Sequence, residues 1–243
     1  MREVLHGDCL ELMKNIPDKS IDMILCDLPY GTTACKWDTI IPFEPLWEQY
    51  KRIIKDNGAI VLTASQPFTS ALVMSNVKMF KYEWIWESNK AANFAQAPYM
   101  PLKNIENVLV FSLGGCAHPA KNRMIYNPQG VTKIEKVCKQ KTVGQYKHKG
   151  GMPTAQSYTQ KGTGYPKQII KIDKEGRLHP TQKPVALFEY LIKTYTNEGD
   201  LVLDNCAGSG TTGVACQNLN RNFILIEKEK EYIDIINSRL KYV

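Results

Sequence analysis

Four consecutive residues after the apolar run 21–26 combine an acid, a rigid residue and an aromatic ring. They are Asp27, Leu28, Pro29 and Tyr30. Pro29 fixes its own φ and biases Leu28 toward an extended conformation. The Asp27 carboxylate, the Leu28 carbonyl and the Tyr30 ring are therefore expected to be held in one arrangement. A plain strand-to-turn transition is the alternative, because Asp, Pro and Gly favour turns.

A second acid follows another apolar run and opens a glycine-rich turn. Asp204 begins the segment, and Gly208, Gly210 and Gly213 match the pattern G-x-G-x-x-G that opens a helix. Glu227 ends the next apolar run, where an acid suits the hydroxyls of a ribose. A surface acid is the alternative for Glu227. No Lys follows the glycines, so the turn indicates a nucleoside cofactor rather than an ATP-type phosphate loop.

The elements that position these segments alternate along the chain. Apolar runs bounded by turn residues predict strands at 3–6, 21–26, 59–63, 82–86, 107–111, 201–203 and 223–226. Helices are predicted after Pro184 and over 228–240. Alternating strands and helices indicate an α/β fold with a doubly wound, mostly parallel sheet. Ligands of such a sheet bind beyond the carboxyl ends of its strands, so the two acidic segments are expected to share one cleft.

The stretch 114–178 interrupts this alternation. It is rich in Gly, Lys, Gln and Thr and has no long apolar periodicity. Residues 112–177 hold thirteen Lys or Arg against three acids, a net charge of +10, so the rest of the chain carries −3. This predicts a small basic insert that meets a polyanion. A flexible, solvated loop is the alternative.

The cysteines and the hydropathy exclude several classes of protein. Seven cysteines, an odd number without C-x-x-C spacing, argue against a disulfide framework and a structural zinc site. We expect reduced thiols and no metal. No apolar run approaches eighteen residues, and the first residues lack the pattern of a signal peptide. A cytoplasmic protein is therefore expected.

Together these segments resemble the DNA amino-methyltransferases. Residues 27–30 resemble the catalytic D-P-P-Y motif, with Leu28 in place of the first proline. Residues 204–212 resemble the cofactor motif D-x-F-x-G-S-G-T-T, with Cys206 in place of Phe. The stretch His179-Pro180-Thr181-Gln182-Lys183-Pro184 is similar to the family's H-P-T-x-K-P, and Gly7-Asp8 is similar to its adenine-contacting acid. The order of these motifs is that of the family's β group.

The resemblance implies a Rossmann-like methyltransferase fold with a circularly permuted, seven-stranded sheet, in which strand 3–6 lies beside strand 223–226. It divides the chain into a catalytic half (1–113), a target-recognition insert (114–178) and a cofactor-binding half (179–243). The implied cofactor is S-adenosyl-L-methionine. Its implied contacts are Asp8, Cys9, Lys183, Asp204, Cys206, Gly208, Ser209, Gly210, Thr211, Thr212 and Glu227. Asp8 is equally well placed to cap a short helix together with Glu11, and a solvated lysine is the alternative for Lys183.

The implied reaction is methylation of an exocyclic amino group of a base in double-stranded DNA. Asp27 and the Leu28 carbonyl would accept its N–H bonds, and Tyr30 would stack on a base flipped out of the duplex. Asp27 at the start of the motif favours adenine N6 over cytosine N4. Related enzymes are often dimers. A lone prokaryotic or phage enzyme and one half of a restriction–modification pair, with its endonuclease, fit the sequence equally well.

Three other classes compete with this interpretation. A nicotinamide-dependent oxidoreductase would use the glycine turn and Glu227, but it leaves residues 27–30 and the basic insert unexplained. A non-catalytic DNA-binding protein would bind DNA in a salt-sensitive way without transferring methyl groups. An enzyme that methylates RNA or protein is the third, and the basic insert alone does not distinguish it from an enzyme that methylates DNA.

Overall fold

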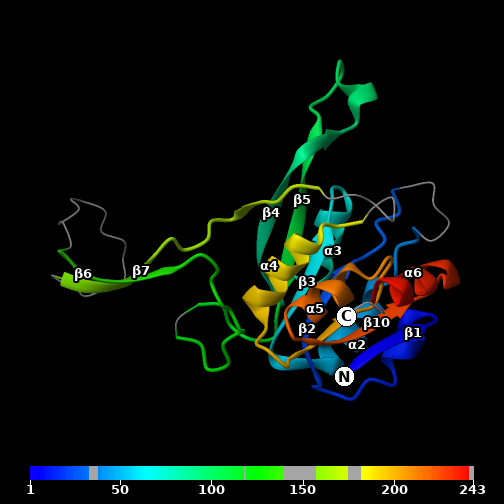
Figure 1. The fold of residues 1–243 in the computed structure, drawn as a ribbon, viewed down its shortest axis with the longest axis horizontal. Helices are drawn as coiled ribbons and strands as arrows, with labels where there is room; N and C mark the ends of the chain where they lie inside the picture. The colour runs from blue at the N-terminus through cyan, green and yellow to red at the C-terminus, as the bar shows by residue number, and fades with distance from the viewer. Residues whose placement is uncertain (33–37, 118, 140–156, 175–181, 241–243) are drawn as a thin grey trace. The chain divides into compact units, whose positions relative to one another are not determined.

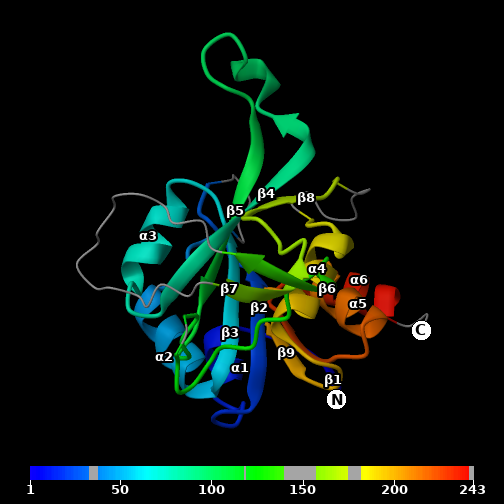
Figure 2. The same cartoon turned by 90° about the vertical axis from the view of Figure 1, so that its left-hand side faces the viewer.

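The computed structural model describes residues 1–32, 38–117, 119–139, 157–174 and 182–240. The chain forms two compact units. Unit 1 comprises Met1–Asn127 and Gln168–Val243, and unit 2 comprises Pro128–Lys167. Unit 1 is an α/β body, as Figures 1 and 2 show. Among the described helices, none combines the length and apolar character needed to cross a membrane.

Unit 1 is built on an eight-stranded sheet with the order β1-β10-β9-β2-β3-β5-β4-β8. In that order the strands are Arg2–His6, Asn222–Glu227, Leu201–Asp204, Ile21–Asp27, Ile54–Ala64, Lys103–Phe111, Phe80–Ala92 and Ile169–Lys171. Five of the seven pairings are parallel, and β5 is antiparallel to both β3 and β4. The mostly parallel sheet is therefore confirmed, and all seven predicted strands are present.

The prediction of seven strands was wrong by one. The extra strand, β8, is three residues long and pairs with β4 through Ile85 and Ile169. A strand this short shows no apolar alternation, so it could not be separated from the surrounding polar stretch. The predicted permutation is confirmed, because β1 pairs in parallel with β10. Arg2 lies opposite Phe223 at one end of the pairing, and His6 lies opposite Glu227 at the other.

The strand order changes direction between β9 and β2. On one side of this point the sheet continues from β9 through β10 to β1, the first strand of the chain, and on the other side it continues from β2 to β3. Because β9 and β2 are parallel neighbours, Asp204 and Asp27 end adjacent strands at the same edge of the sheet. This is the switch point at which open α/β sheets bind ligands.

Three helices pack against each face of the sheet. One face is covered by α1 (Cys9–Met13), α2 (Phe43–Ile53) and α3 (Phe68–Ser75), and the other by α4 (Val185–Tyr195), α5 (Thr211–Asn218) and α6 (Lys230–Leu240). The predicted helix after Pro184 corresponds to α4, with Pro184 at its N-cap, and the predicted helix 228–240 corresponds to α6.

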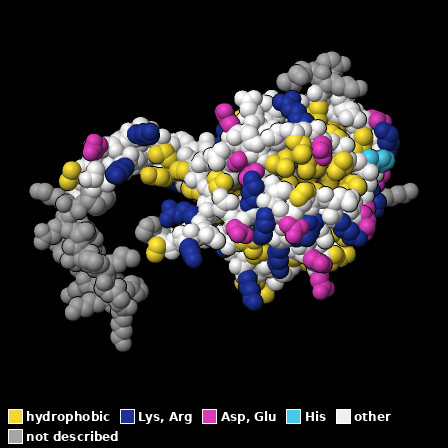
Figure 3. Space-filling view, turned by 90° about the horizontal axis from the view of Figure 1, so that it is seen from below, with side chains coloured by type: hydrophobic (Ala, Val, Ile, Leu, Met, Phe, Trp, Pro, Cys, Tyr) yellow, Lys and Arg dark blue, Asp and Glu magenta, His cyan; other side chains and the backbone are white. Residues whose placement is uncertain are grey.

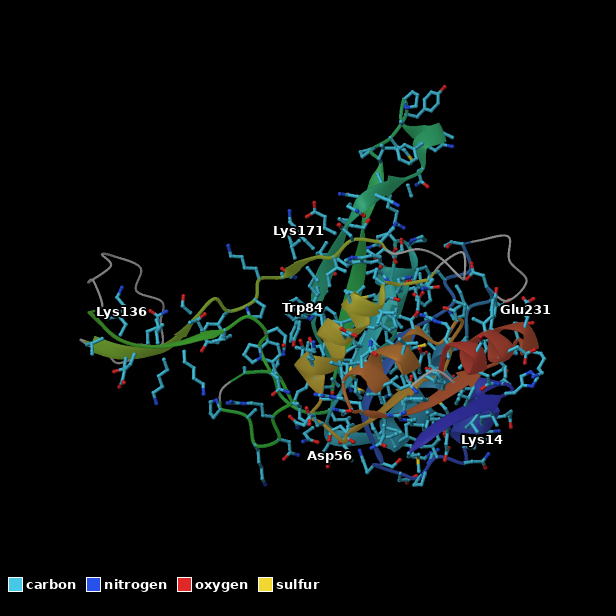
Figure 4. The ribbon with its side chains drawn as sticks, viewed as in Figure 1. Lys14, Asp56, Trp84, Lys136, Lys171 and Glu231 are labelled. Carbon is cyan, nitrogen blue, oxygen red and sulfur yellow. The ribbon has the colours of Figure 1, made fainter. Side chains whose placement is uncertain are left out.

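Burial on both faces explains the continuous apolar run of β2. Ile24 and Cys26 point into the first core, between the sheet and α1–α3, and Met23 and Leu25 point into the second core, between the sheet and α4–α6. In the second core Trp84 lies between β4 and α4 (Figure 4), where its Nε1 donates to the Tyr195 hydroxyl at 2.6 Å.

Unit 2 contains a two-stranded antiparallel sheet of β6 (Thr132–Lys139) and β7 (Ser157–Thr163). Unit 2 spans a shorter part of the sequence than the predicted insert 114–178. Met124 is buried in the second core, and the Asn127 N–H donates to the Thr194 carbonyl at 2.7 Å, so this part of the polar stretch belongs to unit 1. Residues after Gln168 return to unit 1 as β8.

Candidate active site

A cavity of about 530 Å³ lies at the carboxyl ends of β2, β9 and β10. Both acidic segments predicted from the sequence contribute to its wall. The predicted site residues that line it are Asp8, Cys9, Asp27, Leu28, Pro29, Tyr30, Lys183, Asp204, Cys206, Gly208, Ser209, Thr211 and Glu227. The structure therefore brings residues 27–30 and the glycine-rich turn at residues 208–210, here called the glycine bend, into one cleft.

Gly210 and Thr212 were expected at the cofactor as well, but neither lines the cavity. Gly210 is the N-cap of α5 with φ +79°, and a Cβ added there would lie 2.9 Å from Ile236 Cγ1. Thr212 is buried, and its hydroxyl donates to Asp204 Oδ2. Both residues therefore determine the shape of the bend without lining the cavity. His179, Pro180 and Thr181 lie outside the described residues.

The Asp27 carboxylate is the centre of a hydrogen-bond network. Tyr30 Oη donates to its Oδ1 at 2.8 Å and lies 3.0 Å from Thr63 Oγ1. The Thr63 hydroxyl also donates to Oδ1, and Lys183 Nζ donates to Oδ2 at 2.7 Å. Two hydroxyls and an ammonium therefore fix the orientation of this carboxylate at the cavity wall.

Lys183 is a buried cation shared between two carboxylates. Its side chain is 7% exposed, and its Nζ lies 2.7 Å from Asp27 Oδ2 and 3.2 Å from Glu106 Oε2. Burial alone would lower the pKa of Lys183, but the charges of Asp27 and Glu106 outweigh it and raise the pKa above its usual value. The lysine is charged at neutral pH, and the three groups together carry one net negative charge.

The Tyr30 ring is fixed by packing as well as by its hydroxyl. It stacks on Phe68 with 5.2 Å between ring centroids and an interplanar angle of 25°, and Lys183 Nζ lies 5.7 Å from its centroid. Burial, together with the charges of Asp27 and Glu106, raises the pKa of the Tyr30 hydroxyl, so it remains a hydrogen-bond donor. The ring is a rigid part of the wall.

The glycine bend is held in place by two charged side chains. Glu227 is buried at the end of β10, and its Oε2 accepts the Gly208 N–H at 2.7 Å. Its Oε1 accepts the N–H groups of Lys228 and Glu229, each at 2.8 Å. From α6, Arg239 Nη1 donates to the Ser209 carbonyl at 2.6 Å. Glu227 therefore supports the bend as well as lining the cavity.

Asp8 takes the helix-capping position, and it also lines the cavity. Its carboxylate accepts the N–H groups of Leu10 at 2.9 Å and Glu11 at 3.4 Å, which caps α1. A carboxylate oxygen can accept a second hydrogen bond, so the cap leaves Asp8 able to contact a ligand. The two interpretations drawn from the sequence are compatible.

Cys206, at the position where the resemblance leads us to expect Phe, belongs to a cluster of thiols. Its thiol contacts those of Cys9 and Cys26, and it accepts from Asn205 Nδ2 at 3.5 Å. Burial raises the pKa of Cys26 to about 12, so this thiol is protonated at neutral pH. Tyr50 Oη donates to Asn205 Oδ1 at 2.5 Å, which ties the loop to α2. The described residues contain no group of three or more His, Cys, Asp or Glu suited to a metal ion.

Sequence reasoning missed three residues that organise the site. Thr63 pairs with Asp27 across β3 and β2, and as the last residue of a predicted strand it could have been found. Asp38 accepts the N–H groups of Gly31 and Thr32 at 2.8 and 2.9 Å. Glu106 lies near the start of β5 and reaches the cavity because β5 is antiparallel to its neighbours. That direction is not visible in the sequence.

Comparison with known proteins agrees with this geometry. The family of DNA methylases that comprises N6 and N4 methyltransferases matches residues 21–238. DNA adenine methyltransferase YhdJ of Escherichia coli (strain K12) is 30% identical over 253 residues, which cover 98% of this chain and 82% of that protein. Type II methyltransferase M.HinfI of Haemophilus influenzae is 27% identical and covers 100% and 69%, respectively.

Solved structures show the same fold. The M1.HpyAVI–SAM complex has a TM-score of 0.67 and 26% identity, and the likeness covers 99% of each chain. The PvuII DNA methyltransferase, described as cytosine-N4-specific, has a TM-score of 0.68 at 16% identity over 97% of this chain and 85% of its own. With a family match over most of its length and the Asp27 turn and glycine bend in one cavity, this chain belongs to the family of N6 and N4 DNA methylases.

Proposed function

We propose that the protein transfers the methyl group of S-adenosyl-L-methionine to the N6 amino group of adenine in double-stranded DNA. The observation that carries this proposal is the shared cavity. Asp27, in its network of Tyr30, Thr63 and Lys183, lines the same cavity as the glycine bend and Glu227. One part of the wall is suited to an amino group and the other to a nucleoside cofactor.

The cavity fits the cofactor in size and in the chemistry of its wall. A volume of about 530 Å³ lies within the usual range for cofactor sites. A Cβ added to Gly208 would meet nothing within 4 Å, so this glycine leaves space beside the cavity. Glu227 and Asp8 would hold the ribose and adenine, and Phe188 adds an apolar surface. When bound, the cofactor supplies a methyl group already activated as a sulfonium.

The chain's own residues would act on the amino group of the target base. Each carboxylate oxygen can accept two hydrogen bonds. Among the described contacts, Oδ2 of Asp27 accepts one, from Lys183, so it can accept a second from a ligand. Asp27 and the Leu28 carbonyl would accept the two N–H bonds and draw the nitrogen toward tetrahedral geometry. Asp27 need not remove the proton before the nitrogen attacks.

The charge of the site supports the same role. Two carboxylates and one ammonium leave one net negative charge beside the place where positive charge develops on the nitrogen. Glu106 offsets Lys183, which would otherwise oppose that developing charge. We propose that Lys183 and Glu106 act as positioning residues, because they act through Asp27.

The target base would enter the cavity by leaving the duplex. An amino group inside base-paired DNA is out of reach, so the nucleotide must be extruded. Tyr30 is held by Phe68 and by its hydrogen bond to Asp27, and its ring would stack on the extruded base. The fixed ring would orient the amino group toward Asp27 without further ordering of the side chain.

The choice of adenine rests on Asp27 opening the catalytic motif and on the likeness to a relative named as an adenine methyltransferase. Cytosine N4 is the alternative. Tritiated methyl transfer to plasmid DNA from methyltransferase-free cells, followed by nucleoside analysis, tests this choice. We expect label in N6-methyl-2′-deoxyadenosine, and label in N4-methyl-2′-deoxycytidine would contradict adenine specificity while leaving the reaction class intact. No label in either nucleoside would contradict the proposed function.

Unit 2 would bind the DNA backbone. Residues 128–167 hold eight Lys or Arg and one acid, Glu135. A stretch with this charge should make DNA binding strongly salt-dependent, through release of counterions. A homodimer and a cognate restriction endonuclease are further expectations that follow from the resemblance, and a cytoplasmic location is one that follows from the hydropathy of the sequence.

A further inference from the structure

Beyond Asn107, strands β4 and β5 leave the main sheet and continue as a hairpin. β3 pairs with β5 only as far as Ala64 and Asn107, whereas β4 and β5 pair onward to Ala92 and Lys103. Every residue over 93–103 is exposed, including the short 3₁₀ helix η1 (Phe94–Gln96). Figures 1 and 2 show the hairpin extending away from the body of unit 1, to which it belongs.

The hairpin rises from the wall of the cavity. Trp86 on β4 and Lys103 and Glu106 on β5 line the cavity, and the free end of the hairpin lies between them in the sequence, after Trp86 and before Lys103. At the base of the hairpin, β8 supports β4, and Lys171 of β8 (Figure 4) lies 3.1 Å from Glu87. A large ligand that inserts one group into the cavity must therefore pass close to the hairpin.

The side chains of the hairpin suit a nucleic acid. Tyr99 is 84% exposed, Phe94 69% and Met100 51%. Over 88–105 the sequence holds two cations, Lys90 and Lys103, and no acid. By contrast, the face seen from below in Figure 3 carries Lys or Arg and Asp or Glu side by side. Exposed aromatic rings on a segment that carries only positive charge match bases that stack and phosphates that attract cations.

We propose that residues 88–105 form a DNA-contacting hairpin, separate from unit 2. Phe94 and Tyr99 stack against bases of the bound DNA, and Lys90 lies near the phosphate backbone. This proposal rests on the proposed function, because it takes DNA as the ligand whose base enters the cavity. Insertion of side chains between base steps is a known means of stabilising distorted DNA.

The test compares three double variants. Phe94→Ser with Tyr99→Ser removes both rings, and Phe94→Tyr with Tyr99→Phe keeps them. Met74→Ser with Val77→Ser is the matched control, because these side chains are 73% and 55% exposed at the end of α3 and just beyond it and do not line the cavity. Each protein is measured for affinity to mixed-sequence duplex DNA at fixed salt, for cofactor affinity by calorimetry, and for methyl transfer to plasmid DNA.

Loss of both rings should weaken DNA binding by at least about tenfold, since each stacked base contributes about that factor. kcat/KM for DNA should fall at least as far, with cofactor affinity unchanged. The aromatic exchange variant and the control should match the wild type. Wild-type DNA affinity in the ring-free variant would overturn the proposal. If the sedimentation of that variant also differed from that of the wild type, the rings would instead form a contact between copies of the protein. If the wild type transfers no methyl group, the proposed function fails, and the affinity comparison still tests the hairpin.

Discussion

Lys183 donates to Asp27 at 2.7 Å, so the carboxylate at the centre of the site is held by a cation that is itself buried. An unshared ion pair of this kind would neutralise Asp27 and oppose the positive charge that, in the proposed reaction, develops on the target nitrogen. Glu106, 3.2 Å from the same ammonium, restores one net negative charge. The proposed role of the Asp27 carboxylate therefore depends on a residue 79 positions away in the sequence.

Glu106→Gln should slow methyl transfer by at least about tenfold with little change in cofactor affinity, because Lys183 would then pair with Asp27 alone. Single-turnover transfer and calorimetry measure the two effects separately. Glu83→Gln is the control, since Glu83 is a partly buried carboxylate that accepts from Asn107 and does not line the cavity.

A second substitution shows whether Glu106→Gln slows the reaction by changing the charge of the site or by damaging the fold. Glu106→Gln combined with Lys183→Gln restores one net negative charge around Asp27. This double variant should transfer methyl groups faster than Glu106→Gln alone. A double variant that is no faster than Glu106→Gln alone would contradict the electrostatic role of Glu106.

Glu227→Gln should weaken cofactor binding by about tenfold or more and lower the free energy of unfolding by about 1–3 kcal/mol. The carboxylate accepts three backbone N–H groups with its two oxygens, and an amide nitrogen cannot accept any of them. Calorimetry with S-adenosyl-L-methionine and urea unfolding measure both effects. Glu231→Gln, an acid in the first turn of α6, serves as the control. Unchanged affinity and stability would show that Glu227 does not organise the bend.

The two glycines of the bend should respond differently to Ala. Gly210→Ala places a Cβ 2.9 Å from Ile236 at φ +79°, so we expect a loss of about 1–3 kcal/mol in the free energy of unfolding. Gly208→Ala meets no atom within 4 Å, so only its φ of +50° opposes the substitution, and the free energy of unfolding should fall by about 1 kcal/mol. Because Gly208 lines the cavity, its variant should lose more cofactor affinity than stability. The opposite pattern in thermal unfolding and calorimetry would contradict the assignment of these two residues.

Stability should depend on pH through Asp204. Burial raises the pKa of Asp204 to about 7 from an ordinary value of 3.8. Between these values the folded protein keeps a proton that the unfolded chain has released, so the stability falls as the pH rises through this range. Asp204→Asn removes this dependence, and its stability relative to the wild type should rise from about pH 4 to about pH 7, by up to about 4 kcal/mol. Parallel urea titrations across this range measure it, and a constant difference would show that Asp204 ionises normally.

Most of the sheet and both acidic segments could be predicted from the sequence because they depend on local patterns. Apolar runs identify β2 and β9, and the acids that follow them are brought together by the parallel pairing of those strands. Glu106 could not be predicted, because its place in the site depends on the antiparallel direction of β5. The same holds for Gly210, whose contact with Ile236 depends on how α6 packs.

The central claim is that Asp27 acts on the target amino group and is not needed to hold the cofactor. Asp27→Asn is the most direct test, because the side chain keeps its size and loses its charge. Calorimetry should give an affinity for S-adenosyl-L-methionine within about threefold of the wild type, since the cofactor wall is formed by other residues. Single-turnover assays on the same cofactor-loaded protein should show methyl transfer reduced by about a hundredfold or more. Transfer at close to the wild-type rate would contradict the account.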